Sequence, residues 1–483
     1  MKKTGFHIIF FSTVLFLFFS CSKADDTQAT DVLPPIYPDY TNITIPYNIA
    51  PLNFILRNKP SQTQVILKGQ SGSITFTGSD KIQFSEKRWK KFIHSEQGNT
   101  VTVQVRAKIS GQWIKYKTFN WSIVTDKIDP YLSYRLSEPA YDISNKIQLC
   151  GRHLESFDVK IYADNHLINN AKLDYLTYGY QNPNLTFFSI DGEKGGIILN
   201  RDGLLKKIKI ENKNILPEYG NFHPSGKYGV FPINKEAVAL HTLSENRFET
   251  YNTSSSIVVI DFDKEQIISS SFSNSGDHIE TYPVFSADGN EIYYCAASLF
   301  SLPDSLKYQK YHLCKIYFDS QKGGFTNKID TLINSSLENK SIALPKPSPN
   351  GLYLLYNTLE YETSPPSYQK TKIQLLNLRT MEADSLSVVN QEVPNTYHSW
   401  SSNSHWFVFS SKRDDGIYER LYFCYIDNKG KVYKPFILPQ RNPYYYDYSL
   451  KSFAYPELSS SKLSFNSTDI EHLYWEAKIE EFK

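Results

Sequence analysis

The charged run Lys412-Arg413-Asp414-Asp415-Gly416 carries the residue types best suited to ligand chemistry in this chain of 483 residues. Two carboxylates and a guanidinium at a loop tip offer directional partners to a sugar, a peptide terminus or Ca²⁺. The same residues also suit a plain turn, in which Asp414-Asp415-Gly416 reverses the chain and Arg413 pairs with a neighbouring element. We favour the turn and keep Arg413, Asp414 and Asp415 as candidate ligand-binding residues.

Cys21 is a candidate for covalent lipid attachment. Lys2 and Lys3 precede an apolar stretch from Ile8 to Phe19. That stretch is shorter than the ~20 residues of a membrane-spanning helix, so it predicts a cleaved export signal. A small residue directly before Cys21 resembles the bacterial lipobox, in which the cysteine becomes the acylated N-terminus. We therefore predict a lipoprotein signal peptide over residues 1–20 and a membrane anchor at Cys21, since each buried CH₂ contributes ~0.8 kcal/mol. An ordinary signal peptide with an incidental cysteine is the alternative.

An acidic pair, Asp25-Asp26, follows the candidate lipidated cysteine. Such a pair resembles the surface-export signal of lipoproteins in the Bacteroidetes. We therefore expect an outer membrane lipoprotein, with exposure at the cell surface as the less specific part of that expectation. Residues 21–35 are polar and end in Pro34-Pro35, which predicts a tether between the lipid and the first domain.

Other side chains that could do chemistry are scattered. The four remaining cysteines form no CxxC, so buried free thiols are expected, with one disulfide as the alternative. His398 and His405 stand seven residues apart, which is poor spacing for zinc. No GxSxG nucleophile elbow occurs, which argues against a peptidase. We predict no metal, no cofactor and no catalytic residue, and leave enzymatic activity open. The four cysteines are Cys150, Cys295, Cys314 and Cys424.

The elements that must position the charged loop are antiparallel strands. The stretch His398–Asp427 reads as a tight turn, an aromatic strand, the charged loop and a second strand, which is the pattern of one propeller blade. Similar turns begin at positions 180, 222, 285, 347 and 400, and each leads into an apolar strand. Asp-Gly, Asn-Gly or Ser-Gly at the turn supplies positive φ, while the copies at Tyr180 and Trp400 rely on Asn. Repeats of a constant unit with loops of different length are typical of propellers.

A smaller β-domain is expected before these repeats, over residues 36–125. Six short strands separated by Gly- and Ser-rich turns favour an immunoglobulin-like sandwich. The domain would act as a spacer. The predicted strands are 43–45, 53–56, 65–67, 73–76, 101–105 and 117–121.

The repeats resemble the PD40 repeats of TolB-type six-bladed propellers over residues 130–483, most closely in the lipoproteins of Bacteroidetes. The resemblance implies an all-β fold and an envelope protein as binding partner. Five units are visible, and we expect the sixth from 129–157 together with the tail at 461–465, which would join the chain ends in one blade. Some members carry a CxxCH haem motif, but this chain has Tyr175, Tyr178 and Tyr180 in the corresponding region. A cytochrome-like role is therefore not expected.

Composition restricts the partners. The net charge is +2, which gives no reason to expect nucleic acid or an acidic substrate. Aromatic residues make up 15% of the chain, which favours strands. The tract Pro443–Tyr448 could stack on a sugar or peptide face or pack between blades. A protein-binding platform is the leading hypothesis. Glycan binding or processing is the second, and an architectural spacer, favoured if side chains fill the propeller axis, is the third.

Overall fold

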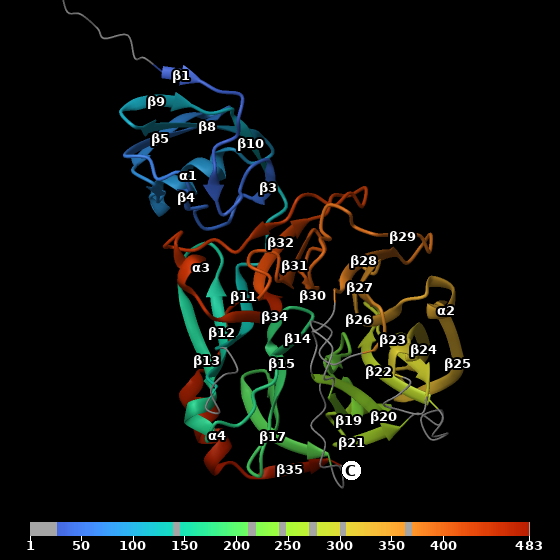
Figure 1. Cartoon of the computed structure of the whole chain (residues 1–483). Coiled ribbons are helices and arrows are strands. Elements are labelled where there is room, and N and C mark those ends of the chain that lie inside the picture. Colours follow the sequence, from blue (N-terminus) through green and yellow to red (C-terminus); the bar gives the residue numbers. More distant parts are fainter. Residues whose placement is uncertain are drawn as a thin grey trace, which may run out of the picture.

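The computed structural model describes residues 27–138, 145–210, 219–240, 248–269, 278–299, 306–362 and 370–482. Figure 1 shows an N-terminal domain beside a larger body built from four- and five-stranded sheets. Within the described ranges no helix is both long and apolar enough to cross a membrane.

The N-terminal domain contains a seven-stranded sheet, a three-stranded sheet and one helix. All six predicted strand positions fall in or overlap observed strands. The larger sheet contains β1 (Thr27–Ala29), β9 (Gln112–Lys115), β8 (Thr100–Ile109), β10 (Phe119–Val124), β3 (Ile43–Pro46), β5 (Gln62–Gly69) and β6 (Gly72–Gly78). The smaller sheet contains β2 (Ile36–Tyr37), β4 (Phe54–Leu56) and β7 (Lys81–Ile82).

Helix α1 (Glu86–Ser95) is an element that the predicted immunoglobulin-like sandwich did not include. Trp89, Phe92 and Ile93 are buried, and their spacing places them on one helical face. The Trp89 ring contacts Trp121 of β10 edge to face, with centroids 5.6 Å apart. The helix therefore contributes directly to the core of this domain.

The segment predicted as a tether is partly folded. Strand β1 pairs in parallel with β9, so Thr27 lies opposite Trp113 and Ala29 opposite Lys115. The Thr30 amide also donates to the Lys115 carbonyl at 2.9 Å. The tether prediction for 21–35 is therefore wrong from residue 27 onward, because polar side chains do not prevent backbone pairing at a sheet edge.

The larger body is a β-propeller made of six sheets, which we call blades 1 to 6. Within each blade the first strand named below is innermost. Blade 1 contains β34 (Ser452–Ser459), β11 (Tyr131–Ser137), β12 (Ile147–His153) and β13 (Val159–Asp164); blade 2 contains β14 (Thr177–Gly179), β15 (Asn182–Ile190), β16 (Gly196–Arg201), β17 (Leu204–Ile210) and β35 (Ile479–Phe482). Blade 3 contains β18 (Asn221–Phe222), β19 (Tyr228–Leu240), β20 (Phe248–Asp261) and β21 (Gln266–Ser269); blade 4 contains β22 (His278–Phe285), β23 (Glu291–Ser298), β24 (His312–Asp319) and β25 (Gly324–Ile333). Blade 5 contains β26 (Ser341–Pro347), β27 (Tyr353–Leu359), β28 (Lys372–Asn377) and β29 (Ala383–Asp384); blade 6 contains β30 (Asn395–Trp400), β31 (Trp406–Ser411), β32 (Arg420–Tyr425) and β33 (Phe436–Ile437).

The predicted opening turns connect the first two strands of blades 2 to 6. Blade 1 combines three strands from the start of the propeller with one strand from its C-terminal part, as expected. The closing strand, however, is β34 at Ser452–Ser459 rather than the predicted tail at 461–465. Residues after the closing strand instead form α4 (Ser467–Glu476) and β35. Helix α4 starts at a capping box formed by Asn466 and Asp469, and β35 extends blade 2 as a parallel strand on β17.

The two opening turns without glycine receive other segments of the chain. The Gln181 carbonyl accepts hydrogen bonds from the amide of Ser460 (3.0 Å) and the hydroxyl of Ser459 (3.3 Å), at the end of the closing strand. In blade 6, Asn403 donates to the Lys127 carbonyl in the interdomain linker at 2.7 Å. These turns therefore depart from the repeat pattern where the chain joins itself or the first domain.

The two domains share one hydrophobic core. Trp121 of the N-terminal domain and Trp406 of blade 6 belong to the same cluster of buried side chains. The Trp406 indole donates to the Asp126 carbonyl at 2.8 Å, and Asn53 donates to the Gln440 carbonyl at 3.1 Å. The N-terminal domain is therefore packed against the propeller rather than connected to it only by a linker.

Candidate functional site

The innermost strands surround the propeller axis. Each contacts the next around the circle, and β34 contacts β14. In β22, β26, β30 and β34 the pairing register shifts so that two residues lie opposite one residue of the next strand. The first residue of each bulge has a left-handed backbone, with φ between 50° and 53°. These first residues are Tyr282, Leu344, Tyr397 and Tyr455.

Bulky residues are rare in the left-handed region, so four aligned examples point to a built feature. A bulge turns a side chain away from the direction that the strand alone would give it. Three of the second bulge residues are Pro283, Pro345 and Pro456, which suits a position without a ladder hydrogen bond. The third strand in this set has His398 at the same place.

Aromatic rings from the bulges and from the residues before β14 and β18 fill the propeller axis. Tyr175 stacks on Tyr455 with ring centroids 4.6 Å apart, and the ring centroid of Tyr397 lies 3.9 Å from that of Tyr455. Tyr219 contacts both Tyr175 (5.7 Å) and Tyr282 (4.8 Å). Four of these tyrosines and Leu344 belong to one buried cluster, and the partly buried Tyr455 packs against it. We call these five tyrosines and Leu344 the axial ring. A cavity of about 30 Å³ remains beside the axial ring, which is enough to hold a water molecule.

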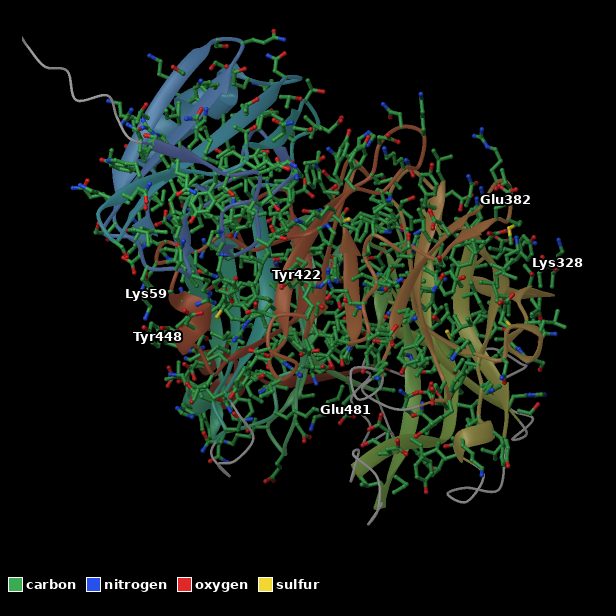
Figure 2. The ribbon with its side chains drawn as sticks, turned by 45° about the horizontal axis from the view of Figure 1, so that its top comes forward. Lys59, Lys328, Glu382, Tyr422, Tyr448 and Glu481 are labelled. Atoms are coloured by element: carbon green, nitrogen blue, oxygen red, sulfur yellow. The ribbon has the colours of Figure 1, made fainter. Side chains whose placement is uncertain are left out.

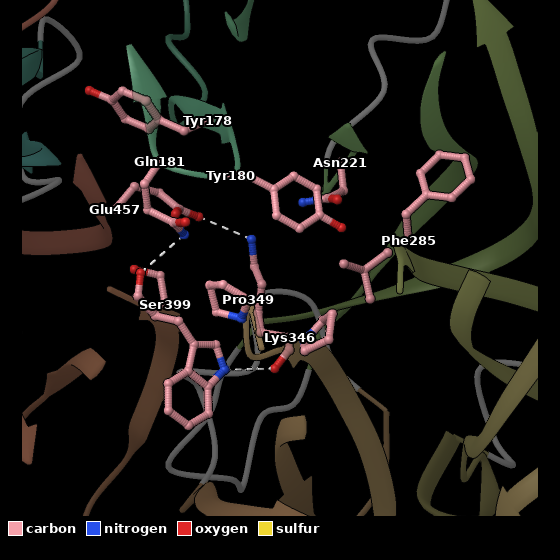
Figure 3. A pocket seen from close by; sticks show the side chains of 12 residues that line it. Tyr178, Tyr180, Gln181, Asn221, Phe285, Lys346, Pro349, Ser399 and Glu457 are labelled. Carbon is pink, nitrogen blue, oxygen red and sulfur yellow. Dashed lines mark hydrogen bonds and ion pairs between the residues drawn. The ribbon is translucent and has the colours of Figure 1, made fainter. Parts of the chain in front are cut away.

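A second layer of side chains follows the bulges and lines a small pocket, which we call the axial pocket (Figure 3). Lys346 of β26 pairs with Glu457 of β34 across blade 6, with 3.0 Å between Nζ and Oε1. Gln181 donates to the Trp400 carbonyl at 3.1 Å. The full lining is Tyr178, Tyr180, Gln181, Asn221, Val284, Phe285, Lys346, Pro347, Pro349, Ser399, Trp400 and Glu457.

Several buried polar atoms at the axial pocket have no hydrogen-bond partner among the described residues. Two of them, Oε1 of Gln181 and Oγ of Ser399, belong to the lining. A third, Oγ1 of Thr177, belongs to the residue that precedes the lining residue Tyr178 in β14. Leaving a buried polar atom unpaired costs about 1–3 kcal/mol. A ligand group that reaches these atoms would therefore gain by satisfying them.

Burial governs the ionisation of the charged groups near the axis. It raises the pKa of Glu457, and the Lys346 ammonium opposes that rise. Burial also lowers the pKa of His398 to about 3, and the nearby Lys346 charge acts in the same direction. His398 is therefore neutral at physiological pH. The lining of the axial pocket holds a single carboxylate, so paired-acid catalysis has no basis there.

Arg413 is held inside blade 6. One terminal nitrogen, Nη2, donates to the Val389 carbonyl at 2.7 Å and to Oδ1 of Asn395 at 2.6 Å. Nε donates to the Ser411 hydroxyl at 2.9 Å, and the guanidinium lies 4.6 Å from the ring centre of Tyr422. Burial lowers the pKa of Arg413. These internal hydrogen bonds favour a structural role for Arg413 over a role in ligand binding.

The two neighbouring aspartates have different surroundings. Asp415 accepts hydrogen bonds from the amides of Ile417 (2.8 Å) and Tyr418 (2.7 Å), which makes it part of the turn. Asp414 accepts one from the Tyr37 hydroxyl of the N-terminal domain at 2.5 Å. Burial raises the pKa of Asp414. The structure thus brings Arg413 and Asp414 to the domain boundary and leaves Asp415 in the loop itself.

A cleft of about 480 Å³ lies at this boundary, and we call it the interdomain cleft. Arg413 and Asp414 line it, together with residues of both domains. Lys434 and Asp39 form an ion pair on its wall, with 2.7 Å between Nζ and Oδ2. The full lining is Tyr37, Pro38, Asp39, Val388, Gln391, Arg413, Asp414, Tyr422, Lys434, Pro435, Phe436 and Ile437.

The aromatic tract before the closing strand mostly packs. The Tyr446 hydroxyl donates to the Leu438 carbonyl at 2.7 Å in the interior, and the Tyr444 hydroxyl bonds to Asp80 of the N-terminal domain. Tyr448, at the end of α3 (Tyr445–Tyr448), is 75% exposed and lies at the edge of the molecule in Figure 2. One ring of this tract is thus available for stacking.

The predicted lipidation residue, Cys21, lies outside the described residues. The other four cysteines are buried free thiols, as predicted. Across the described ranges, no cluster of three or more His, Cys, Asp or Glu residues has the geometry to hold a metal ion. His398 is buried near the axis, whereas His405 lies 3.8 Å from Asp126 of the linker.

The axial ring and the Lys346–Glu457 pair were not predicted from the sequence. A usable signal was present, because a tyrosine or leucine followed by Pro, Gly or His recurs shortly before each opening turn of blades 3 to 6 and in the closing strand. Aligning only the turns misses this motif. The spatial pairing of Lys346 with Glu457 has no local signal, since 111 residues separate them in the chain.

Comparison with known proteins identifies no family. No family model matches the chain, and no curated protein matches it. Among solved structures, prolyl oligopeptidase B from Galerina marginata is 11% identical over 64% of this chain, with a TM-score of 0.34. The chain spans 44% of the length of that protein.

Two further structures are similar at the same level. The β-propeller domain of the Trilobed protease from Pyrococcus furiosus is 10% identical, covering 63% of this chain and 80% of its own, with a TM-score of 0.32. A DUF4784 family protein from Bacteroides caccae is 8% identical to this chain, with a TM-score of 0.32. The match covers 74% of this chain and 97% of that protein. The propeller assignment rests on the sheets described above.

Proposed function

We propose that this protein is a lipid-anchored cell-envelope protein whose TolB-like propeller is a platform for a protein partner. The observation that carries the proposal is the axial pocket, where Gln181 and Ser399 present unpartnered buried atoms beside the Lys346–Glu457 pair. The pocket itself measures about 40 Å³, which is too small for a cofactor or a sugar ring. Its size and chemistry fit a single polar side chain that protrudes from a partner surface.

The partner group should both donate and accept hydrogen bonds. Glu457 offers a carboxylate and Lys346 an ammonium, while Gln181 offers an amide oxygen. Tyr180 and Phe285 add apolar area around the opening. An amide side chain on the partner would donate to the carboxylate and the amide oxygen and accept from the Lys346 ammonium. Apolar contacts around it would exclude water.

Affinity capture tests this proposal. Residues 22–483 serve as bait for envelope extract, and wild type is compared with the double variant Lys346→Gln/Glu457→Gln. The matched control is Lys315→Gln/Glu291→Gln, an ion pair of 2.6 Å in blade 4 whose side chains are 18% and 20% exposed, against 25% and 9% for Lys346 and Glu457. We expect a partner that the control retains and the axial variant loses at least about tenfold, as for a hot-spot contact. Equal capture by both variants at equal thermal stability would overturn the axial pocket as the binding site.

The anchor is tested separately. Cys21→Ser should release the protein from the membrane fraction, because the acyl chains would be absent. Unchanged membrane retention would reject the lipoprotein proposal. Protease treatment of intact cells then tests display, since degradation of the propeller places it outside the cell and survival of the whole chain places it inside the envelope.

Glycan binding is a second candidate, and the interdomain cleft favours it. The cleft volume of about 480 Å³ suits a saccharide, and Asp414, Arg413 and Tyr37 supply the polar groups that sugar hydroxyls require. Envelope polysaccharide that binds wild type but not Asp414→Ala would support this function. Binding that is unaffected by Asp414→Ala would remove it.

The spacer alternative draws support from the axial ring, because side chains do fill the axis. A spacer has no need for unpartnered polar atoms in the axial pocket, however, and their presence favours binding. Capture that yields no partner for wild type would favour the spacer.

A further inference from the structure

The near-neutral net charge of the chain conceals a strong asymmetry between its two parts. Residues 27–125 contain twelve Lys and Arg against five Asp and Glu, a net charge of +7. Residues 126–483 contain thirty-seven against forty-three, a net charge of −6. Such an asymmetry suggests that the N-terminal domain meets an anionic surface, because its long-range field differs in sign from that of the propeller.

Part of this positive charge is gathered on the outer face of the seven-stranded sheet. Residues directly opposite each other in paired strands share a face. Arg106 lies opposite Lys115, and Lys108 lies opposite Trp113. Lys68 of β5 lies opposite Thr102, which shares the face of Arg106 and Lys108 because alternate residues of β8 point the same way. We call this set the basic face.

No carboxylate offsets these charges within the sheet. None of the seven strands contains an Asp or a Glu. The other outward positions between the basic residues are uncharged, such as Gln64 opposite Arg106 and the apolar Ile66 opposite Gln104. Lys68 and Lys115 are exposed, and Lys108 is partly exposed. The basic face therefore carries four positive charges and no carboxylate within the sheet.

The position of β1 places the basic face next to the proposed anchor. Thr27 and Ala29 of β1 pair with Trp113 and Lys115, so the first folded residues lie at the edge of this face. The Arg106 guanidinium bonds to the Thr27 hydroxyl at 2.5 Å. From Cys21 to Thr27 the chain can span at most about 20 Å. Figure 1 shows β1 and β9 at the end of the N-terminal domain that is remote from the propeller.

Trp113 adds a residue type that favours membrane interfaces. Its ring is partly exposed, and the Arg106 guanidinium lies 5.6 Å from the ring centre. Tryptophan residues gather at the level of lipid headgroups, and flanking Lys and Arg reach the phosphates. Trp113 thus lies beside the basic residues that would contact lipid phosphates together with it.

We propose that the basic face docks on an anionic phospholipid surface and holds the N-terminal domain against the membrane that carries the anchor. Its location beside the bilayer rests on the proposed lipid attachment at Cys21. The docking itself depends only on charge and on Trp113. The propeller, which is negatively charged, then faces away from the bilayer.

Vesicle binding by residues 22–483, which lack the acyl chains, tests this proposal. The vesicles consist of phosphatidylcholine alone or with about one-third phosphatidylglycerol. We expect cosedimentation with the anionic vesicles only, weakened by added salt because screening shortens the range of the attraction. The triple variant Lys68→Glu/Lys108→Glu/Lys115→Glu should bind at least about tenfold more weakly.

The matched control is Lys340→Glu/Lys429→Glu/Lys478→Glu, which reverses three exposed lysines of the propeller. It should bind like wild type. Equal losses in both triple variants would overturn the proposal, as would equal binding to both vesicle types or binding to a DNA duplex without binding to vesicles. Membrane fractionation of the Cys21→Ser variant tests the lipid anchor independently of vesicle binding. Failure of docking and failure of lipidation therefore give different results.

Discussion

Asp129, at the end of the interdomain linker, accepts two hydrogen bonds from Ser402 in the opening turn of blade 6. One comes from the Ser402 amide at 2.7 Å and one from its hydroxyl at 2.6 Å. The carboxylate is buried, which raises its pKa, and the Ser402 hydrogen bonds oppose that rise. The opening turn of blade 6 thus also fastens the linker that leads from the N-terminal domain.

Removing this contact should loosen the domain boundary. Asp129→Ala leaves the Ser402 amide without its buried partner, so we expect a loss of about 1–3 kcal/mol in the free energy of unfolding. Urea denaturation measures the loss, and hydrogen exchange should show faster exchange in residues 126–129 and 400–405. Asp263→Ala, at a half-exposed position, is the control and should change stability by less than about 0.5 kcal/mol. Equal effects of the two substitutions would contradict the role of Asp129.

The axial ring should contribute strongly to stability. Tyr175→Ala removes a ring that contacts Tyr219 and Tyr455, so it leaves a cavity between inner strands. We expect a loss of about 3–5 kcal/mol, as for other large aromatic truncations in cores. Tyr448→Ala removes the same side chain at a 75% exposed position and should cost less than about 0.5 kcal/mol. Comparable losses at both sites would show that the ring does not hold the blades together.

His398 should make the protein sensitive to acid. Its folded-state pKa of about 3 lies below the ordinary value of 6.5. Between these pH values the unfolded chain binds the proton and the folded chain does not, so stability falls as the pH falls. The contribution of His398 to the free energy of unfolding is fully present above pH 6.5. Below that pH it decreases by up to about 1.4 kcal/mol per pH unit.

The substitution His398→Leu should remove this part of the pH dependence. Unfolding free energies at several pH values between 6.5 and 4 measure the slope for wild type and variant, and other titrating groups cancel in the difference. His472→Leu, with a side chain 71% exposed, should keep the wild-type slope. Parallel profiles for wild type and His398→Leu would refute the assignment.

Arg413 should respond to substitution as a structural residue. Arg413→Lys keeps a charge but loses the planar set of donors that reaches Ser411, Val389 and Asn395, so we expect a loss of about 1–3 kcal/mol. Lys412→Ala beside it is the control. Stability equal to wild type in Arg413→Lys would return Arg413 to the group of ligand-binding candidates, and calorimetric titration with envelope polysaccharide would then test it.

Local sequence signals predicted most of the blades correctly. The Asp288-Gly289 and Asn350-Gly351 turns supply positive φ at glycine, and both connect the first two strands of a blade. Such signals work because turn geometry depends on a few adjacent residues. The closing strand was placed wrongly because no turn connects β34 to β11, so its partner is chosen by tertiary contact alone.

The helix and the pairing of the first strand were missed for related reasons. Helix α1 carries its apolar residues within a charged run, so its buried face is clear only beside Trp121. Strand β1 is held by the edge of β9 and has no apolar pattern of its own. Contacts with neighbouring strands therefore stabilise these two segments, which have no clear apolar pattern of their own.

The sequence by itself determined the repeating unit, the buried free thiols and the candidate loop, because each depends on residue type and short spacing. Tertiary structure alone decided which residues share a site. Lys346 meets Glu457, Tyr175 stacks on Tyr455, and Asp414 bonds to Tyr37 only because the circle of blades closes and the N-terminal domain packs on it. These contacts join residues separated by about a hundred positions or more, and their formation depends on how whole sheets pack.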